Sequence, residues 1–153
     1  MKKLLLVLVA VMGLTFAANA QYNGKAIGVR LNGGNHYNGG EISFQTPVGS
    51  NRAELNVGWA NSDFVSFTGF YQWLGGIAGD FGWFFGPGAN LGYCINHGFG
   101  VAAALEGGVE WNPSGIPFQF TLDVRPMWDF IKRDGCAYNG FAIGGGLGIR
   151  YKL

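Results

Sequence analysis

From residue 25 onward, apolar side chains alternate with small or polar ones in short runs. The last run, 141–153, is the clearest, with Phe141 and Ile143 in the apolar phase and Arg150 in the other. Successive side chains of a β-strand point to opposite faces, so this alternation predicts a strand with one apolar face. Seven earlier runs repeat the pattern. The eight predicted strands span residues 25–32, 41–48, 53–60, 64–74, 81–93, 100–111, 117–129 and 141–153.

The connections between these strands are short and rich in glycine, asparagine and serine, which favours turns between antiparallel neighbours. One predicted turn is Gly49-Ser50-Asn51-Arg52 and another is Gly75-Gly76. Two connections are longer, a glycine-rich one at 33–40 and a charged one at 130–140. Pro87 falls inside the fifth strand, and because proline cannot donate to a ladder we expect a bulge or kink there.

The first twenty residues have the features of a cleaved export signal. Lys2 and Lys3 precede a largely apolar stretch at 4–16, and Ala18-Asn19-Ala20 is a small-x-small cleavage site. The sequence therefore predicts a signal peptide over 1–20 and one mature domain over 21–153. Removal of the two lysines changes the formal charge from +1 to −1. With no basic excess, a nucleic-acid partner is not expected.

Charged residues make up only 12% of the chain, roughly half the usual share in a soluble domain. No charge lies in the apolar phase in mid-strand, where an Arg or Lys facing lipid would cost about 2–4 kcal/mol. A soluble barrel shows the opposite arrangement, with charges outside. The polar phase carries Arg30, Glu41, Glu54, Glu106, Glu110, Asp123, Arg125, Arg150 and Lys152, which we expect to pair inside the lumen.

These patterns together predict an all-β fold, an eight-stranded antiparallel up-and-down transmembrane β-barrel. The predicted strand lengths suit a tilted crossing of a bilayer. The remaining charges of the mature chain are assigned to turns, loops and strand ends, among them Lys25, Arg52 and Asp80. Aromatic side chains near the strand ends predict two membrane-interface girdles. One girdle comprises Tyr71, Trp73, Trp83, Trp111, Phe118 and Tyr151, and the other Trp59, Tyr93, Trp128 and Phe141.

The chain has an export signal, alternating strands and a last strand that ends in Arg150-Tyr151-Lys152-Leu153. In these features it resembles the small eight-stranded outer-membrane β-barrel proteins of the OmpX and OmpA-barrel type. This type is also described as a porin-family barrel domain. The resemblance implies a place in the outer membrane of a Gram-negative bacterium, in contact with lipid and lipopolysaccharide. It also implies that the barrel-assembly machinery recognises the last strand. The implied role is structural or adhesive, and we assign the working surface to residues 33–40 and 130–140.

Two other functions are alternatives. Some barrels that this chain resembles are lipid A-modifying enzymes that use a histidine, and here only His36 and His97 are available, both in predicted connections. A narrow passive channel is the second alternative. A secreted soluble sandwich is the alternative fold. No group of residues has metal-ligand spacing, so we expect no metal, no cofactor and no catalytic residues.

The chain has two cysteines, and the predicted topology places them at the same end of the barrel. Cys94 closes the fifth strand and Cys136 lies in the long connection before the last strand. Exported proteins enter an oxidising compartment, where a disulfide is permitted. We therefore name Cys94 and Cys136 as a candidate disulfide.

Overall fold

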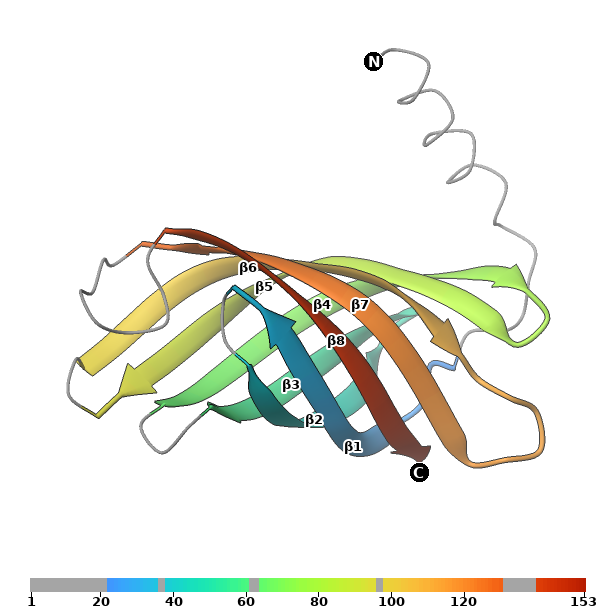
Figure 1. Ribbon diagram of the computed structural model, residues 1–153. Coiled ribbons are helices and arrows are strands. Elements are labelled where there is room, and N and C mark those ends of the chain that lie inside the picture. Colours follow the sequence, from blue (N-terminus) through green and yellow to red (C-terminus); the bar gives the residue numbers. More distant parts are fainter. Residues whose placement is uncertain (1–21, 36–37, 61–63, 96–97, 131–139) are drawn as a thin grey trace, which may run out of the picture.

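The structure is a computed structural model that describes residues 22–35, 38–60, 64–95, 98–130 and 140–153. These residues form one closed barrel in which each strand pairs with the next and the last pairs with the first (Figure 1). The strands are β1 (Ala26–Gly34), β2 (Gly39–Val48), β3 (Asn51–Ala60), β4 (Phe64–Ala78), β5 (Phe81–Cys94), β6 (Gly98–Trp111), β7 (Phe118–Asp129) and β8 (Phe141–Lys152).

All eight strand pairs are antiparallel, and β1 closes the barrel against β8 from the pair Ala26–Lys152 to the pair Gly34–Gly144. The predicted eight-stranded up-and-down barrel is therefore confirmed. None of the described residues forms a helix long and apolar enough to cross a membrane. The predicted signal peptide, 1–20, lies outside the described residues.

The barrel has two distinct ends. We call the end with the connections 49–50, 79–80 and 112–117 the turn end, and Tyr22 and Leu153 both lie there. We call the other end, which carries all the remaining connections, the loop end. Of the predicted working surface, the described residues 33–35, 38–40, 130 and 140 lie at the loop end. Residues 36–37 and 131–139 are outside the described residues.

Two turns differ from the prediction. The β2–β3 connection is the two-residue turn Gly49-Ser50, where Gly49 has a φ of 63°, so Arg52 belongs to β3 rather than to the turn. The β4–β5 connection is Gly79-Asp80, where Gly79 has a φ of 54°, and Gly75-Gly76 lies within β4. Both true turns place glycine in the left-handed region, which other residues rarely adopt.

The expected bulge at Pro87 is absent. The pairs Phe70–Gly88 and Trp73–Phe85 on either side of Pro87 keep the same register, so the ladder with β4 lacks two pairs but contains no extra residue. The irregularity in this hairpin lies near its turn instead, between Gly76 and Ala78. The strand thus tolerates proline by leaving two positions of its ladder with β4 unpaired.

The turn end is tied together by local contacts. The Tyr22 hydroxyl lies 2.7 Å from the Lys25 carbonyl oxygen and 3.2 Å from that of Leu153. At the neighbouring turns, Ser114 donates to the Asp80 carboxylate from its hydroxyl (2.7 Å) and its backbone N–H (3.0 Å). These hydrogen bonds lower the pKa of Asp80, which keeps that carboxylate ionised as a link between the β4–β5 and β6–β7 connections.

Side chains follow the predicted phases with charge inside and apolar surface outside. On β1, Arg30 is 2% exposed, while its neighbours Val29 and Leu31 are 53% and 67% exposed. The other strands repeat this alternation. The interior of the barrel is therefore polar and its outer surface apolar.

Candidate functional site: a charged network across the lumen

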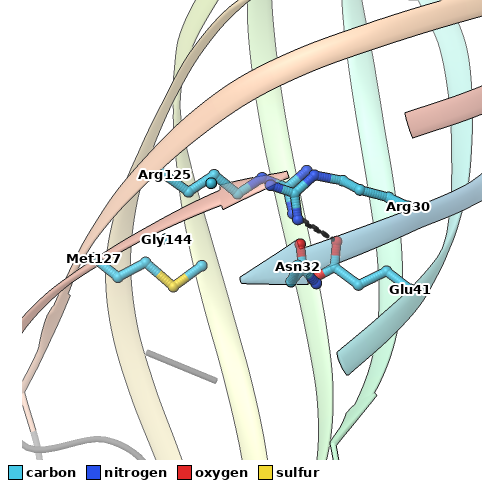
Figure 2. A pocket seen from close by; sticks show the side chains of 7 residues that line it. Arg30, Asn32, Glu41, Arg125, Met127 and Gly144 are labelled. Atoms are coloured by element: carbon cyan, nitrogen blue, oxygen red, sulfur yellow. Dashed lines mark hydrogen bonds and ion pairs between the residues drawn. The ribbon is translucent and has the colours of Figure 1, made fainter. Parts of the chain in front are cut away.

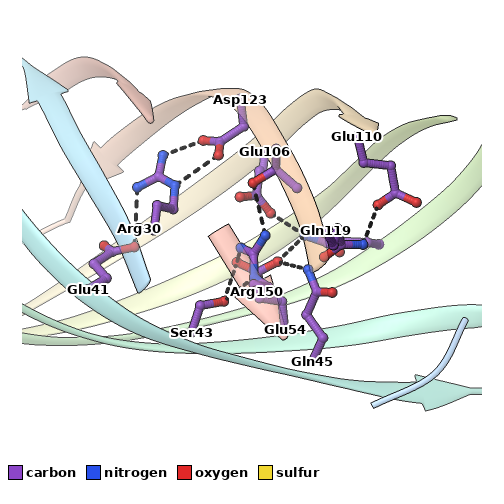
Figure 3. Close-up of polar contacts among 12 residues, drawn as sticks. Arg30, Glu41, Ser43, Gln45, Glu54, Glu106, Glu110, Gln119, Asp123 and Arg150 are labelled. Carbon is purple, nitrogen blue, oxygen red and sulfur yellow. Dashed lines mark hydrogen bonds and ion pairs between the residues drawn. The ribbon is translucent and has the colours of Figure 1, made fainter. Parts of the chain in front are cut away.

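The half of the lumen nearer the turn end is filled by charged side chains that project inward from β1, β2, β3, β6, β7 and β8 (Figure 3). Each belongs to the inward phase of its strand, so the alternation alone directs it to the interior. Four guanidinium groups and five carboxylates are buried there. They are Arg30, Arg52, Arg125 and Arg150 with Glu41, Glu54, Glu106, Glu110 and Asp123.

Arg125 in β7 is the centre of this network. Its guanidinium forms ion pairs with Glu41 of β2 (2.6 Å) and Glu106 of β6 (2.6 Å). It also pairs with Glu54 of β3 at 3.1 Å and approaches Asp123 at 3.6 Å. The guanidinium carbon lies 4.7 Å from the centre of the Phe70 ring, a cation–π contact. One cation therefore neutralises carboxylates from several walls of the barrel.

Glu54 in β3 is the main acceptor. Its Oε1 accepts from Arg150 Nη2 at 2.8 Å and from Arg125 Nη2 at 3.1 Å. Its Oε2 accepts from the side-chain amides of Gln45 (2.8 Å) and Gln72 (3.0 Å). Buried carboxylates are costly unless their lone pairs are occupied, and both oxygens of Glu54 are occupied here.

Arg30 in β1 binds Asp123 with two nitrogens and Glu41 with the third, at 3.2 Å for Glu41. The Arg30 guanidinium lies against β8, where a Cβ built on Gly146 would be 2.2 Å from it. Glycine at 146 is therefore what leaves room for Arg30. Gly148, the next inward position of β8, leaves room in the same way for the Thr121 hydroxyl of β7.

A second part of the network lies closer to the turn end. Arg52 Nη1 donates to Glu110 Oε2 at 2.8 Å, and Arg52 Nε donates to Gln72 Oε1 at 2.7 Å. Gln119 and Asn112 also donate to Glu110. Gln72 in turn donates to Glu54 and Glu106, so it joins the two parts of the network.

Two predicted assignments are corrected by this arrangement. Arg52, assigned to a turn, is fully buried in the lumen and paired with Glu110. Lys152, predicted as part of the network, lies at the turn-end rim, where it donates to the Pro113 carbonyl at 3.4 Å and sits 5.7 Å from the Tyr22 ring. The alternation could have predicted the burial of Arg52, because Arg52, Glu54 and Asn56 occupy every second position and therefore face the same side of β3. The other eight residues predicted to lie in the lumen are buried in it.

Several contacts join strands on opposite sides of the barrel, which shows that side chains occupy its cross-section. Arg125 of β7 reaches Glu54 of β3, four strands away around the barrel. Arg150 of β8 reaches Glu54, and Arg52 of β3 reaches Glu110 of β6. Ion pairs therefore cross the lumen in three places at that level.

A small pocket lies on the loop side of the network (Figure 2). The guanidinium groups of Arg30 and Arg125 converge there above Glu41, with Met127 opposite. The pocket holds about 20 Å³, which is space for roughly one water molecule. It is too small for a sugar or an acyl chain.

The ten residues predicted as girdles all lie on the outer face, Trp83 half-buried and the others exposed. At the turn end, neighbouring rings contact one another, such as Phe118 with Tyr151 at 5.7 Å and Trp111 with Phe120 at 5.3 Å between centres. At the loop end, Trp128 and Phe141 are 4.9 Å apart. Aromatic side chains therefore gather at both ends, as the girdle prediction requires.

Of the histidines and cysteines singled out in the sequence, only Cys94 is among the described residues. His36, His97 and Cys136 lie outside the described residues. Cys94, at the loop end of β5, is not a free thiol, but its pairing with Cys136 stays a prediction. Among the described residues, no three His, Cys, Asp or Glu side chains are grouped as a metal site.

Comparison with protein-family models, with curated proteins and with solved structures found no match to this chain.

Proposed function

We propose that the protein is an integral outer-membrane β-barrel of a Gram-negative bacterium, with a plugged lumen and a structural or surface-interaction role carried by its loop end. One observation supports this most strongly. Every charged side chain that is buried in the described strands points inward, while the outer surface carries large apolar residues along all eight strands. In water such a surface would be an aggregation hazard, whereas in a bilayer it is the expected one.

The exposed aromatic groups give a second line of support. Trp and Tyr are enriched where membrane proteins meet lipid headgroups, because their rings combine an apolar body with a polar group. Here they gather on the outer face near both ends of the barrel. A bilayer that covers the apolar surface between them places the turns and the loops in water on opposite sides.

The alternatives gain less support. A passive channel needs an open path, and ion pairs span the lumen between opposite walls. A lipid-modifying enzyme needs a general base beside a pocket that admits its substrate. The pocket within the lumen has room for roughly one water molecule, and the charged groups around it are engaged in ion pairs. The proposal therefore assigns the interior to stability and the loop end to interaction.

Cell fractionation tests this proposal. The chain, expressed in a Gram-negative host with its first twenty residues, should appear in the outer-membrane fraction and should migrate faster on a gel when it is not heated. A closed barrel unfolds slowly in detergent, which is the cause of that shift. A signal-peptide deletion is the matched control and should remain in the cytoplasm. Recovery of the full chain as a soluble periplasmic monomer would overturn the proposal.

A further inference from the structure

Three polar side chains of the network are fully buried although they lie next to the turn end. Arg52 is the second residue of β3, Gln119 is the second residue of β7, and Glu110 is the last but one of β6. Arg52 and Gln119 are 0% exposed, and Glu110 is 1% exposed. Because their strands end one residue further on, these strands give them little cover from the turn-end side. Part of the cover comes from the chain that precedes β1.

The segment before β1, residues 22–25, lies across the turn-end mouth of the lumen, and we call it the strap. Figure 1 shows it in blue at the turn end, where it leads into β1. The carbonyl oxygen of Tyr22 accepts a hydrogen bond from Arg52 Nη1 at 3.4 Å. Asn23 Nδ2 donates to the Gly49 carbonyl oxygen in the β2–β3 turn at 2.9 Å. The backbone of the strap is therefore held over the lumen and beside that turn.

The Tyr22 side chain anchors the strap on another side of the mouth, against the end of β8. Its hydroxyl lies 3.2 Å from the Leu153 carbonyl oxygen as well as 2.7 Å from that of Lys25. Its ring centre lies 5.7 Å from Lys152 Nζ, a cation–π contact. Lys152 in turn donates to the Pro113 carbonyl oxygen in the β6–β7 connection. The strap thus contacts β3, the β2–β3 turn and β8, and through Lys152 it is linked to the β6–β7 connection.

Gly24 allows the strap to fold in this way. A Cβ built on Gly24 would lie 2.4 Å from the Tyr22 hydroxyl oxygen and 2.5 Å from the ring carbon that carries it. The three atoms nearest to that Cβ all belong to the Tyr22 side chain. A larger residue at position 24 would therefore push the Tyr22 ring away from the end of β8 and would leave the strands in place.

The first residues of a domain are usually poorly ordered unless contacts tie them down. Here the contacts lie at Arg52, at the β2–β3 turn and at the end of β8. We propose that the strap closes the turn-end mouth of the lumen and keeps water away from the Arg52–Glu110 ion pair. The two groups are 2.8 Å apart, and their attraction is stronger in dry surroundings than in water. The strap closes the barrel in detergent and in lipid alike, so its role does not depend on membrane insertion.

Exchange of arginine side-chain protons with solvent tests this role on the folded barrel. Arg52 donates its Nε–H within the network beside the strap, whereas Arg30 and Arg125 donate theirs in the part farther from the turn end. Nuclear magnetic resonance of the ¹⁵N-labelled protein follows each Nε–H separately. Gly24→Ala should raise the exchange rate of the Arg52 Nε–H by about tenfold, because displacing Tyr22 opens the mouth locally. The rates at Arg30 and Arg125 should stay the same.

A deletion of residues 22–24 should raise the Arg52 rate further. Asn51→Ala is the matched control, because it removes a turn-end hydrogen bond to the Tyr71 hydroxyl on the outer face and leaves the strap untouched. It should not change the Arg52 rate.

An unchanged Arg52 rate in both strap variants, each shown to be folded, would overturn the proposal. If the deletion variant fails to fold, the rate in Gly24→Ala alone decides. A similar rise at Arg30, Arg52 and Arg125 would also overturn the proposal, because the strap would then stabilise the barrel as a whole without closing one end.

Discussion

Replacing Arg125 with methionine is expected to lower the free energy of unfolding by about 3–5 kcal/mol, the usual cost of removing one partner from a buried ion-pair network. The size of this loss depends on which carboxylates still have a cation after Arg125 is removed. Glu41 and Asp123 keep Arg30, and Glu54 keeps Arg150. Glu106 keeps no cation, only the amide of Gln72. The loss should therefore come mainly from one uncompensated carboxylate.

A double-mutant cycle separates this cause from lost packing. Glu106→Gln removes the stranded charge, so Arg125→Met combined with Glu106→Gln should be more stable than Arg125→Met alone. Lys152→Met is the control, because Lys152 lies at the rim with one long hydrogen bond and its loss should cost under about 1 kcal/mol. Urea titrations of the barrel in phospholipid vesicles provide the values. If Glu106→Gln gave no rescue, the assignment of Glu106 as the stranded charge would be wrong.

Replacing Val124 with arginine is expected to destabilise the barrel by about 2–4 kcal/mol in a bilayer. Val124 is 52% exposed and lies midway along the outward phase of β7, which runs from Phe118 to Phe130. In that position a guanidinium faces the centre of the hydrocarbon. Folding titrations in phospholipid vesicles measure the effect.

Phe130→Arg is the matched control on the same outward phase. Phe130 is 70% exposed beside the loop-end terminus of β7, where an arginine side chain reaches the headgroups, so its cost should be about 0–1 kcal/mol. A water-exposed face would give a different outcome, since substitutions there usually change stability by less than about 0.5 kcal/mol. Equal, small effects at Val124 and Phe130 would argue against lipid around β7.

The strand phases could be predicted from the sequence because a period of two is a local property and the charged residues are confined to one phase. Arg30, Glu54 and Arg125 were assigned to the interior on that basis alone. The partners of each charge could not be predicted. Whether Arg125 reaches Glu54 depends on how far each strand is shifted against its neighbour around the whole barrel, and no local pattern encodes that shift.

The sequence does not predict Arg52 in the lumen because it predicts a turn that is too long. The segment 49–52 contains several turn-forming residues, but the hairpin needs only two, so Arg52 returns to the strand and to the lumen. In β4, the sequence predicts a turn at Gly75 and Gly76. The structure gives Gly75 a different role, because a Cβ there would lie 2.0 Å from the Trp83 indole. Glycine in a strand can thus mark a close aromatic neighbour as well as a turn.

The most direct test of membrane embedding uses the protein's own tryptophans. All five, Trp59, Trp73, Trp83, Trp111 and Trp128, belong to the outward phase of their strands. Tryptophan fluorescence is measured with the barrel folded in phosphatidylcholine vesicles with brominated acyl chains, and again in the unbrominated lipid. Because bromine quenches on contact, the account predicts loss of most of the emission in the brominated vesicles. Equal emission in both lipids, from protein shown to be folded, would contradict it.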